Sequence, residues 1–191
     1  MLVVQRYPEL FYAYVGIGQV TNAEKAREIA DQFIRDRARE TGREEAIPEL
    51  EAKGGAVREK WVFQFGGVLY GASDWTPFVW AGLTSPVYSL LDLRTLAQGP
   101  SFSNRNMKYN AVQGPLMEEI TQVNVPVYFF VGRHDYTTPS ALVQQYYLSI
   151  QAPQKRLVWF ENSAHFPFFE EPKKFAQEML RVLAETYSQT N

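Results

Sequence analysis

The chain has 191 residues and no cysteine, with 19 lysines and arginines against 21 aspartates and glutamates. This length suits one globular domain, and 46% apolar residues can fill a core, so wholesale disorder is excluded. A net charge of -2 argues against a nucleic-acid binder, which normally carries a basic surplus. No apolar run approaches the roughly 20 residues needed to span a membrane, and no secretory signal is recognisable, so a cytoplasmic protein is expected. The lack of cysteine excludes disulfides, cysteine zinc sites and thiol catalysis.

Charge is concentrated near the amino-terminal end, where residues 21–60 hold 19 of the 40 charged side chains. Before this block, residues 13–17 form a β-prone run that predicts a buried strand. Thr21 and Glu24 have the spacing of a capping box, which predicts a helix that begins there and stops at Gly42. A second short helix is expected over residues 44–53. The charges then form the solvated faces of amphipathic surface helices.

Residues 61–110 are rich in aromatic side chains and contain three of the four tryptophans. Pro77, Pro86 and Pro100 are expected to break this segment into short helices. An apolar, irregular helical region of this kind either packs as a small core of its own or covers an aromatic-lined ligand pocket.

The last third of the chain alternates strands with helices. Residues 125–131 form a continuous apolar run, typical of a strand buried on both faces of a parallel sheet. Thr138 and Pro139 are expected to cap and open the next helix. Residues 156–160 predict another buried strand, and Pro172 begins a closing helix. Its expected apolar face consists of Phe175, Met179, Val182 and Leu183. This order implies parallel pairing through crossover helices.

Two polar loops follow the two carboxy-terminal strands, at residues 132–139 and 161–169. In an open parallel sheet, ligands bind beyond the carboxyl ends of the strands. Asp135 and His165 can meet there, and such a pair fixes the imidazole tautomer so that its other nitrogen acts as a general base. Each residue also has a plain structural interpretation, because Asp135 could cap a helix and His165 could be a hydrogen-bonded loop residue. His134 is expected to point away from the pair.

The segments 128–139 and 161–172 resemble the acid and histidine loops of α/β-hydrolases, in particular the capped branch that includes proline iminopeptidases. The resemblance implies part of an α/β-hydrolase fold, with about three parallel strands, flanking helices and an inserted helical cap. It also implies that Asp135 is the acid and His165 the base of a serine triad. The corresponding domains are the core, 1–19 and 123–191, and the cap, 20–122.

The sequence departs from that family at the nucleophile. The sequence contains no Gly-x-Ser-x-Gly motif. The most similar segment, residues 71–75, lacks the last glycine. The glycine-rich oxyanion loop is missing too. Compared with the family, the chain begins a few residues after the nucleophile, with Met1 as an internal methionine of a longer ancestral sequence. The chain is therefore expected to be inactive alone, since Ser163 has no oxyanion site to support it as a substitute.

The resemblance implies hydrolysis of an ester or amide, with peptides bearing an amino-terminal proline as one substrate class. No metal or organic cofactor is implied, and the partner is a small molecule or short peptide. The expected pocket lies between aromatic side chains of the cap and of the histidine loop, namely Trp61, Phe65, Tyr70, Trp75, Trp80, Phe166 and Phe168.

Other readings follow from the missing serine. The chain could be a non-catalytic remnant or small-molecule binding module, or it could use Asp135 and His165 as a general base without a serine. A strand at residues 13–17 without its usual neighbour leaves an apolar sheet edge, which invites association. Self-association or pairing with a separately made amino-terminal half is therefore expected.

Overall fold

A parallel β-sheet organises the molecule in the computed structural model, which describes residues 1–106 and 115–187. Within those ranges three strands pair in the order β1-β2-β3. Both pairings are parallel, with Tyr14 opposite Val127 and Val127 opposite Lys155. The strands are β1 (Tyr14–Ile17), β2 (Val127–Gly132) and β3 (Lys155–Phe160). The prediction of about three parallel strands is confirmed.

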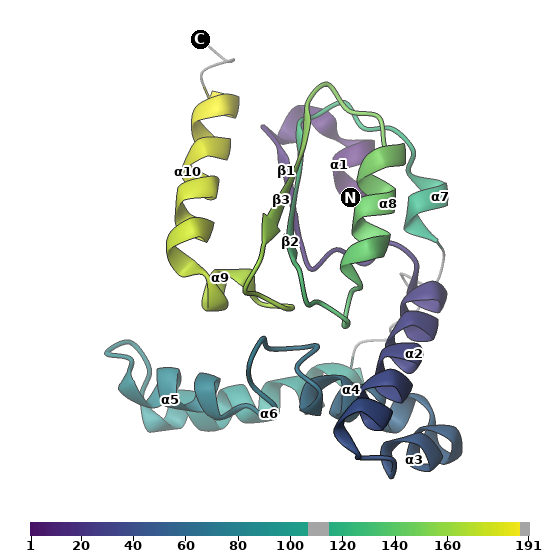
Figure 1. Cartoon of the computed structure of the whole chain (residues 1–191). Coiled ribbons are helices and arrows are strands. Elements are labelled where there is room, and N and C mark those ends of the chain that lie inside the picture. The colour runs from purple at the N-terminus through teal and green to yellow at the C-terminus, as the bar shows by residue number, and fades with distance from the viewer. Residues whose placement is uncertain (107–114, 188–191) are drawn as a thin grey trace.

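Helices cover both faces of this sheet and extend beyond one end of it (Figure 1). The core helices are α1 (Leu2–Arg6), the 3-10 helix η1 (Pro8–Leu10), α7 (Leu116–Glu119), α8 (Ser140–Ser149), α9 (Pro167–Glu170) and α10 (Pro172–Tyr187). The segment between β1 and α7 supplies α2 (Ala23–Thr41), α3 (Ala46–Lys53), α4 (Gly55–Gln64), α5 (Thr76–Thr84) and α6 (Leu90–Asn106). In Figure 1 these five lie together beyond the carboxyl ends of the strands.

Strand β2 is buried along its whole length because its alternating side chains feed two separate cores. Val127, Phe129 and Val131 pack with α1, α7 and α8 on one face. Tyr128 and Phe130 pack with β3 and α10 on the other. The continuous apolar run in the sequence thus reflects a central strand of a sheet covered on both sides.

A third core joins helices α2, α3 and α4. Its centre contains Ile34, Ala38, Leu50 and Trp61, all nearly excluded from solvent. Gly42 ends α2 in the left-handed conformation, as the sequence predicts. Tyr136 and Phe166, from the two polar loops, pack against the edge of this cluster. The helical segment therefore rests directly on the loops that follow β2 and β3.

Two expected helix caps are wrong. Helix α2 is capped by Asn22, whose side-chain oxygen accepts a hydrogen bond from the backbone N–H of Lys25 at 3.0 Å, and Thr21 lies before the cap. Helix α8 begins at Ser140, one residue beyond Pro139, and Thr138 does not cap it. The Thr138 hydroxyl instead donates to Asp135, a stronger acceptor than a neutral group.

Pro100 does not break a helix as expected, because α6 continues from Leu90 to Asn106. The residue before it is Gly99, which has no Cβ and so avoids one clash that normally keeps the residue before a proline out of the helical conformation. Strand β3 is half-buried where a buried strand was expected, and no further strand pairs with its outer edge in the described ranges. On α10 only Val182 of the expected apolar face is buried, and Leu183 is 57% exposed.

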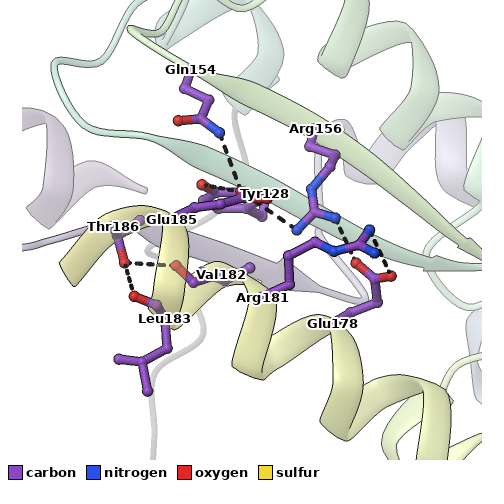
Figure 2. Close-up of polar contacts among 9 residues, drawn as sticks. All are labelled: Tyr128, Gln154, Arg156, Glu178, Arg181, Val182, Leu183, Glu185 and Thr186. Carbon is purple, nitrogen blue, oxygen red and sulfur yellow. Dashed lines mark hydrogen bonds and ion pairs between the residues drawn. The ribbon is translucent and has the colours of Figure 1, made fainter. Parts of the chain in front are cut away.

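A polar cluster fixes α10 to the sheet (Figure 2). Arg156 on β3 binds Glu178 at 2.6 Å, and the Arg156 side chain is only 23% exposed. Glu185, two helical turns after Glu178 on the same face of α10, accepts from the hydroxyl of Tyr128 at 3.0 Å and the amide of Gln154 at 3.2 Å. Burial and the bond to Glu185 raise the pKa of Tyr128 to about 12.

Within the described residues, no helix is long and apolar enough to cross a membrane.

Gly132, the last residue of β2, lies so close to the loop that follows β3 that only glycine fits there. A Cβ built on Gly132 would lie 1.8 Å from the carbonyl oxygen of Ala164. We predict that Gly132→Ala lowers the free energy of unfolding by about 3 kcal/mol, because the backbone must move apart. Urea unfolding measures the change. The control is Gly55→Ala in α4, where the nearest atom to an added Cβ is the guanidinium end of the Arg58 side chain at 3.4 Å. That variant should be as stable as the wild type or slightly more so, and equal losses in both variants would contradict the prediction.

Candidate active site

Asp135 and His165 lie in contact at the carboxyl ends of β2 and β3. The Oδ2 atom of Asp135 is 2.9 Å from Nδ1 of His165. The carboxylate is 3% exposed and the imidazole 24% exposed. The parallel pairing of β2 and β3 brings the two loops together, since His134 N donates to Ser163 O at 3.0 Å just beyond the strands. The pair suggested by the sequence is thus assembled in space.

The Asp135 carboxylate is held in one orientation by its own loop. Its Oδ1 accepts from the backbone N–H groups of Thr137 at 2.8 Å and Thr138 at 2.9 Å. Its Oδ2 accepts from the Thr138 hydroxyl at 2.7 Å. A buried charge requires such partners. Together they aim the remaining lone pair of Oδ2 at the imidazole.

The imidazole of His165 is fixed from the opposite side. Its backbone N–H donates to the carbonyl of Val68 at 3.0 Å. Gly18, just after β1, adopts a left-handed conformation with φ of 57°, and a Cβ there would lie 2.6 Å from Cε1 of the ring. Because Nδ1 faces a carboxylate, it carries the ring proton in the neutral form, which leaves Nε2 as the basic nitrogen. Within residues 1–106 and 115–187 no group hydrogen-bonds to Nε2.

The charges around the ring favour its protonated form. Burial lowers the pKa of His165, but the hydrogen bond and charge of Asp135, together with the charge of Glu170, outweigh burial and raise that pKa above its ordinary value of 6.5. An imidazolium formed during proton transfer would therefore be stabilised where it stands.

The other polar candidates lie elsewhere. His134 stacks on the ring of Tyr70, with centroids 4.3 Å apart, away from the pair as expected. Ser163 is fully buried and donates its hydroxyl to Glu171 at 2.8 Å, so it faces no open space. Among the described residues, no cluster of three histidine or carboxylate side chains could hold a metal ion.

The aromatic candidates divide into separate groups. Trp61 and Phe65 stack in the core of the helical segment and are at least nine-tenths buried. Trp75 makes an edge contact with Phe166, which itself packs against the His165 ring. Trp80 is 67% exposed. Phe168 packs between Phe166 and Phe175.

Two residues beside the pair were not anticipated from the sequence. Phe78 contacts Phe166, with centroids 5.0 Å apart, and stacks on Phe169. Its position after Pro77 at the start of α5 gave no sign that it faces the histidine loop. Glu170 accepts backbone hydrogen bonds on both sides of His165. The only hint of this contact in the sequence was that Glu170 lies five residues after His165.

Two hollows adjoin the site without including the pair. One, of about 570 Å³, is bordered by Phe33, Arg37, Arg43, Tyr70 and His134. The other, of about 290 Å³, lies between α2, α4 and the Asp135 loop and includes Thr137 and Thr138. The cationic groups of the first hollow are already paired, since Arg37 binds Glu40 and Arg43 binds Glu45.

The chain is similar in sequence to one curated protein and in fold to several solved structures. The probable aminopeptidase YbaC of Bacillus subtilis is 30% identical over 190 residues, a match that covers 94% of this chain and 59% of the relative. The crystal structure of VinJ has a TM-score of 0.61 at 15% identity and covers 97% of this chain and 61% of that one. The proline iminopeptidase of Mycobacterium smegmatis has a TM-score of 0.59 at 15% identity and covers 100% and 62%.

The matches also show how much of each relative this chain corresponds to. The chain spans about three-fifths of the length of these relatives. The two structural matches, at 15% identity, concern the fold alone. No protein-family model matches the chain.

We predict that Asp135→Asn lowers the pKa of His165, because burial is then no longer outweighed. Histidine NMR titration measures the shift, with His134→Asn assigning the two imidazole signals. In the wild type the folded chain holds the His165 proton more tightly than the unfolded chain. This tighter proton binding raises the free energy of unfolding. The contribution is complete below pH 6.5, the ordinary pKa, and is lost as the pH rises through the raised pKa of the folded chain. The stability difference between wild type and variant should accordingly shrink with rising pH. An unchanged titration of His165 would contradict this.

We predict that Gly18→Ala displaces the His165 ring and weakens its bond to Asp135. The matched control is Gly42→Ala, because Gly42 has a similar φ of 69° but nothing within 4 Å of an added Cβ. Both variants carry the strain of a left-handed alanine, about 1 kcal/mol. The pKa of His165 should fall in Gly18→Ala and stay at the wild-type value in Gly42→Ala. Equal behaviour of the two variants would show that Gly18 does not position the ring.

Proposed function

The chain carries part of the α/β-hydrolase fold and resembles aminopeptidase-like members of that group, and from this we propose that it contributes the acid and base of a serine hydrolase. In this proposal Asp135 orients His165, and His165 carries the proton. The observation that carries the proposal is the 2.9 Å contact of Asp135 Oδ2 with His165 Nδ1. It leaves Nε2 without a hydrogen-bond partner among the described residues.

The proposed reaction is acyl transfer. A serine hydroxyl gives its proton to His165 Nε2 while its oxygen bonds to the carbonyl carbon of an ester or amide. The imidazolium then donates that proton to the leaving oxygen or nitrogen, and the acyl-serine remains. Water repeats the cycle, losing a proton to Nε2 and releasing the acid and the free serine. Asp135 stays ionised and stabilises the imidazolium at each stage.

The surroundings of the pair favour an apolar substrate. Trp75, Phe78 and Phe166 form a contiguous aromatic group next to the His165 ring. Aromatic side chains of this kind commonly line small-ligand sites. The name of the Bacillus relative makes a short peptide with a free amino terminus a candidate substrate. The name of the Mycobacterium structure adds a peptide that begins with proline.

The serine in this proposal comes from outside the 191 residues, because the sequence contains no Gly-x-Ser-x-Gly turn. Strand β1 offers a place for the segment that bears it. In the described part of the chain β1 pairs with β2 alone, so its outer backbone groups meet no strand. Ile17 at its end is 38% exposed and Tyr12 just before it is 64% exposed. We propose that a polypeptide supplying a further parallel strand docks on this edge.

A second candidate function is ligand binding without turnover. The same absence of a nucleophile turn favours it. The aromatic group around Trp75, Phe78 and Phe166 would then hold a small molecule, and the pair of Asp135 and His165 would serve as a polar anchor.

We predict that a complementing segment restores a reactive serine. The purified chain is mixed with the part of the Bacillus relative that lies outside the matched region, and a fluorophosphonate probe reports an activated serine. The mixture should be labelled and should hydrolyse aryl esters or amino-acid anilides. In His165→Ala the turnover should fall by about 10³-fold or more, because the general base is removed.

The matched control is His134→Ala, which removes the other histidine, stacked on Tyr70 and away from the pair. It should leave turnover near the wild-type rate. An active assembly whose rate is insensitive to His165→Ala would contradict the proposal. A stable assembly that binds peptide but takes up no label would favour the binding module.

A further inference from the structure

Glu170, at the end of α9, collects backbone hydrogen bonds from two distant parts of the chain. Its carboxylate accepts from Ala164 N at 3.0 Å and Phe166 N at 3.1 Å, the residues on either side of His165. It also accepts from Tyr70 N at 2.6 Å, a residue 100 positions earlier. One side chain thus joins the histidine loop to the helical segment.

The partner of Glu170 belongs to a short strap, residues 67–70, that contacts both polar loops. The carbonyl of Gly67 accepts from Tyr136 N at 3.0 Å, next to Asp135. The carbonyl of Val68 accepts from His165 N at 3.0 Å. Tyr70 completes the strap through Glu170. The strap therefore bridges the acid and base loops, and Glu170 is its side-chain anchor.

Gly67 shows how closely the strap is packed. A Cβ at this position would lie 3.0 Å from Cβ of Tyr136 and 2.9 Å from the side chain of Val62. Neither neighbour can move without disturbing the Asp135 loop or the core of the helical segment. The strap is thus a fixed support, and the orientation of His165 depends on how firmly its loop is tied to it.

Glu170 is also a charge close to the imidazole. Burial raises the pKa of the Glu170 carboxyl, the backbone N–H groups of Tyr70, Ala164 and Phe166 lower it in part, and the charge of Asp135 raises it. Two carboxylates act on His165, Asp135 from the loop after β2 and Glu170 from α9. The strap presents backbone to His165, and the phenol of Tyr70 stacks on His134 instead.

We propose that Glu170 is a positioning residue that ties the His165 loop to the strap and holds the imidazole in its basic, correctly oriented state. It acts through His165 and contacts no reacting atom. Its importance for turnover rests on the proposed function, but its effect on the imidazole can be measured without turnover.

The test compares Glu170→Gln with Glu171→Gln in the full chain. Glu171 is a matched control because it binds the same loop, accepting from Asn162 N at 3.0 Å and Ser163 Oγ at 2.8 Å. The charges that raise the pKa of His165 are those of Asp135 and Glu170. Both substitutions remove one negative charge. In NMR titrations the pKa of His165 should shift downward in Glu170→Gln and keep its wild-type value in Glu171→Gln.

Amide exchange gives the second readout. The Tyr70 N–H should exchange roughly tenfold faster in Glu170→Gln, since a hydrogen bond to a charged acceptor is lost, and at the wild-type rate in Glu171→Gln. Glu170→Asp, which keeps the charge but is too short to reach all three N–H groups, should restore much of the imidazole pKa without restoring Tyr70 protection. If Glu170→Gln fails to fold, Glu170→Asp alone decides, because unchanged Tyr70 exchange in it would overturn the proposal.

An unmoved His165 titration in Glu170→Gln, or equal shifts in both glutamine variants, would also overturn it. Either result would leave the hydrolase proposal intact, because that proposal depends on His165→Ala in the complemented assembly. Conversely, an assembly without turnover would leave the effect of Glu170 on the imidazole standing.

Discussion

Parallel pairing between β2 and β3 continues beyond both strands and holds the two polar loops against each other. Arg133 N donates to Phe160 O at 2.9 Å, and the next residue, His134, donates to Ser163 O at 3.0 Å. Gly132 allows this approach because a Cβ would occupy the space of the Ala164 carbonyl. Everything in the candidate site depends on this contact, since backbone hydrogen bonds alone bring the loops of Asp135 and His165 together.

Two half-buried or buried carboxylates flank the imidazole, and both are stabilised mainly by backbone N–H groups. Asp135 receives them from its own loop, whereas Glu170 receives them from its neighbouring loop and from the strap. Ionised groups removed from water need such donors. The arrangement has a structural consequence, because the donors to Glu170 come from both sides of the boundary between the sheet and the helical segment. The same bonds that solvate its charge therefore join the two parts.

The hydrophobic pattern of the sequence predicted the strands of the sheet well, but it predicted helix ends and solvent-exposed faces poorly. The apolar run before Gly132 predicted a strand buried on both faces, and the polar loops after the two strands predicted that Asp135 and His165 can meet. The predicted cap of α8 was wrong because its side chain had a competing partner: the hydroxyl of Thr138 donates to Asp135. The apolar positions of α10 were periodic, yet Leu183 is 57% exposed because periodicity identifies a face without saying what covers it. Likewise, Trp61 is aromatic whether it lines a pocket or fills a core, and here it fills a core.

The sequence by itself determined the alternation of strands and helices, the chain order of Asp135 and His165 at two successive strand ends, and the absence of a Gly-x-Ser-x-Gly turn, because these are local properties of residue type and spacing. Tertiary structure alone decided that Asp135 and His165 touch, that Gly18 abuts the ring, and that Glu170 reaches a segment 100 residues away. Such contacts arise from strand register and loop packing, which bring together residues that no local pattern relates. The strap of residues 67–70 belongs to this second class, since its role lies in carbonyl and amide groups that every residue type offers.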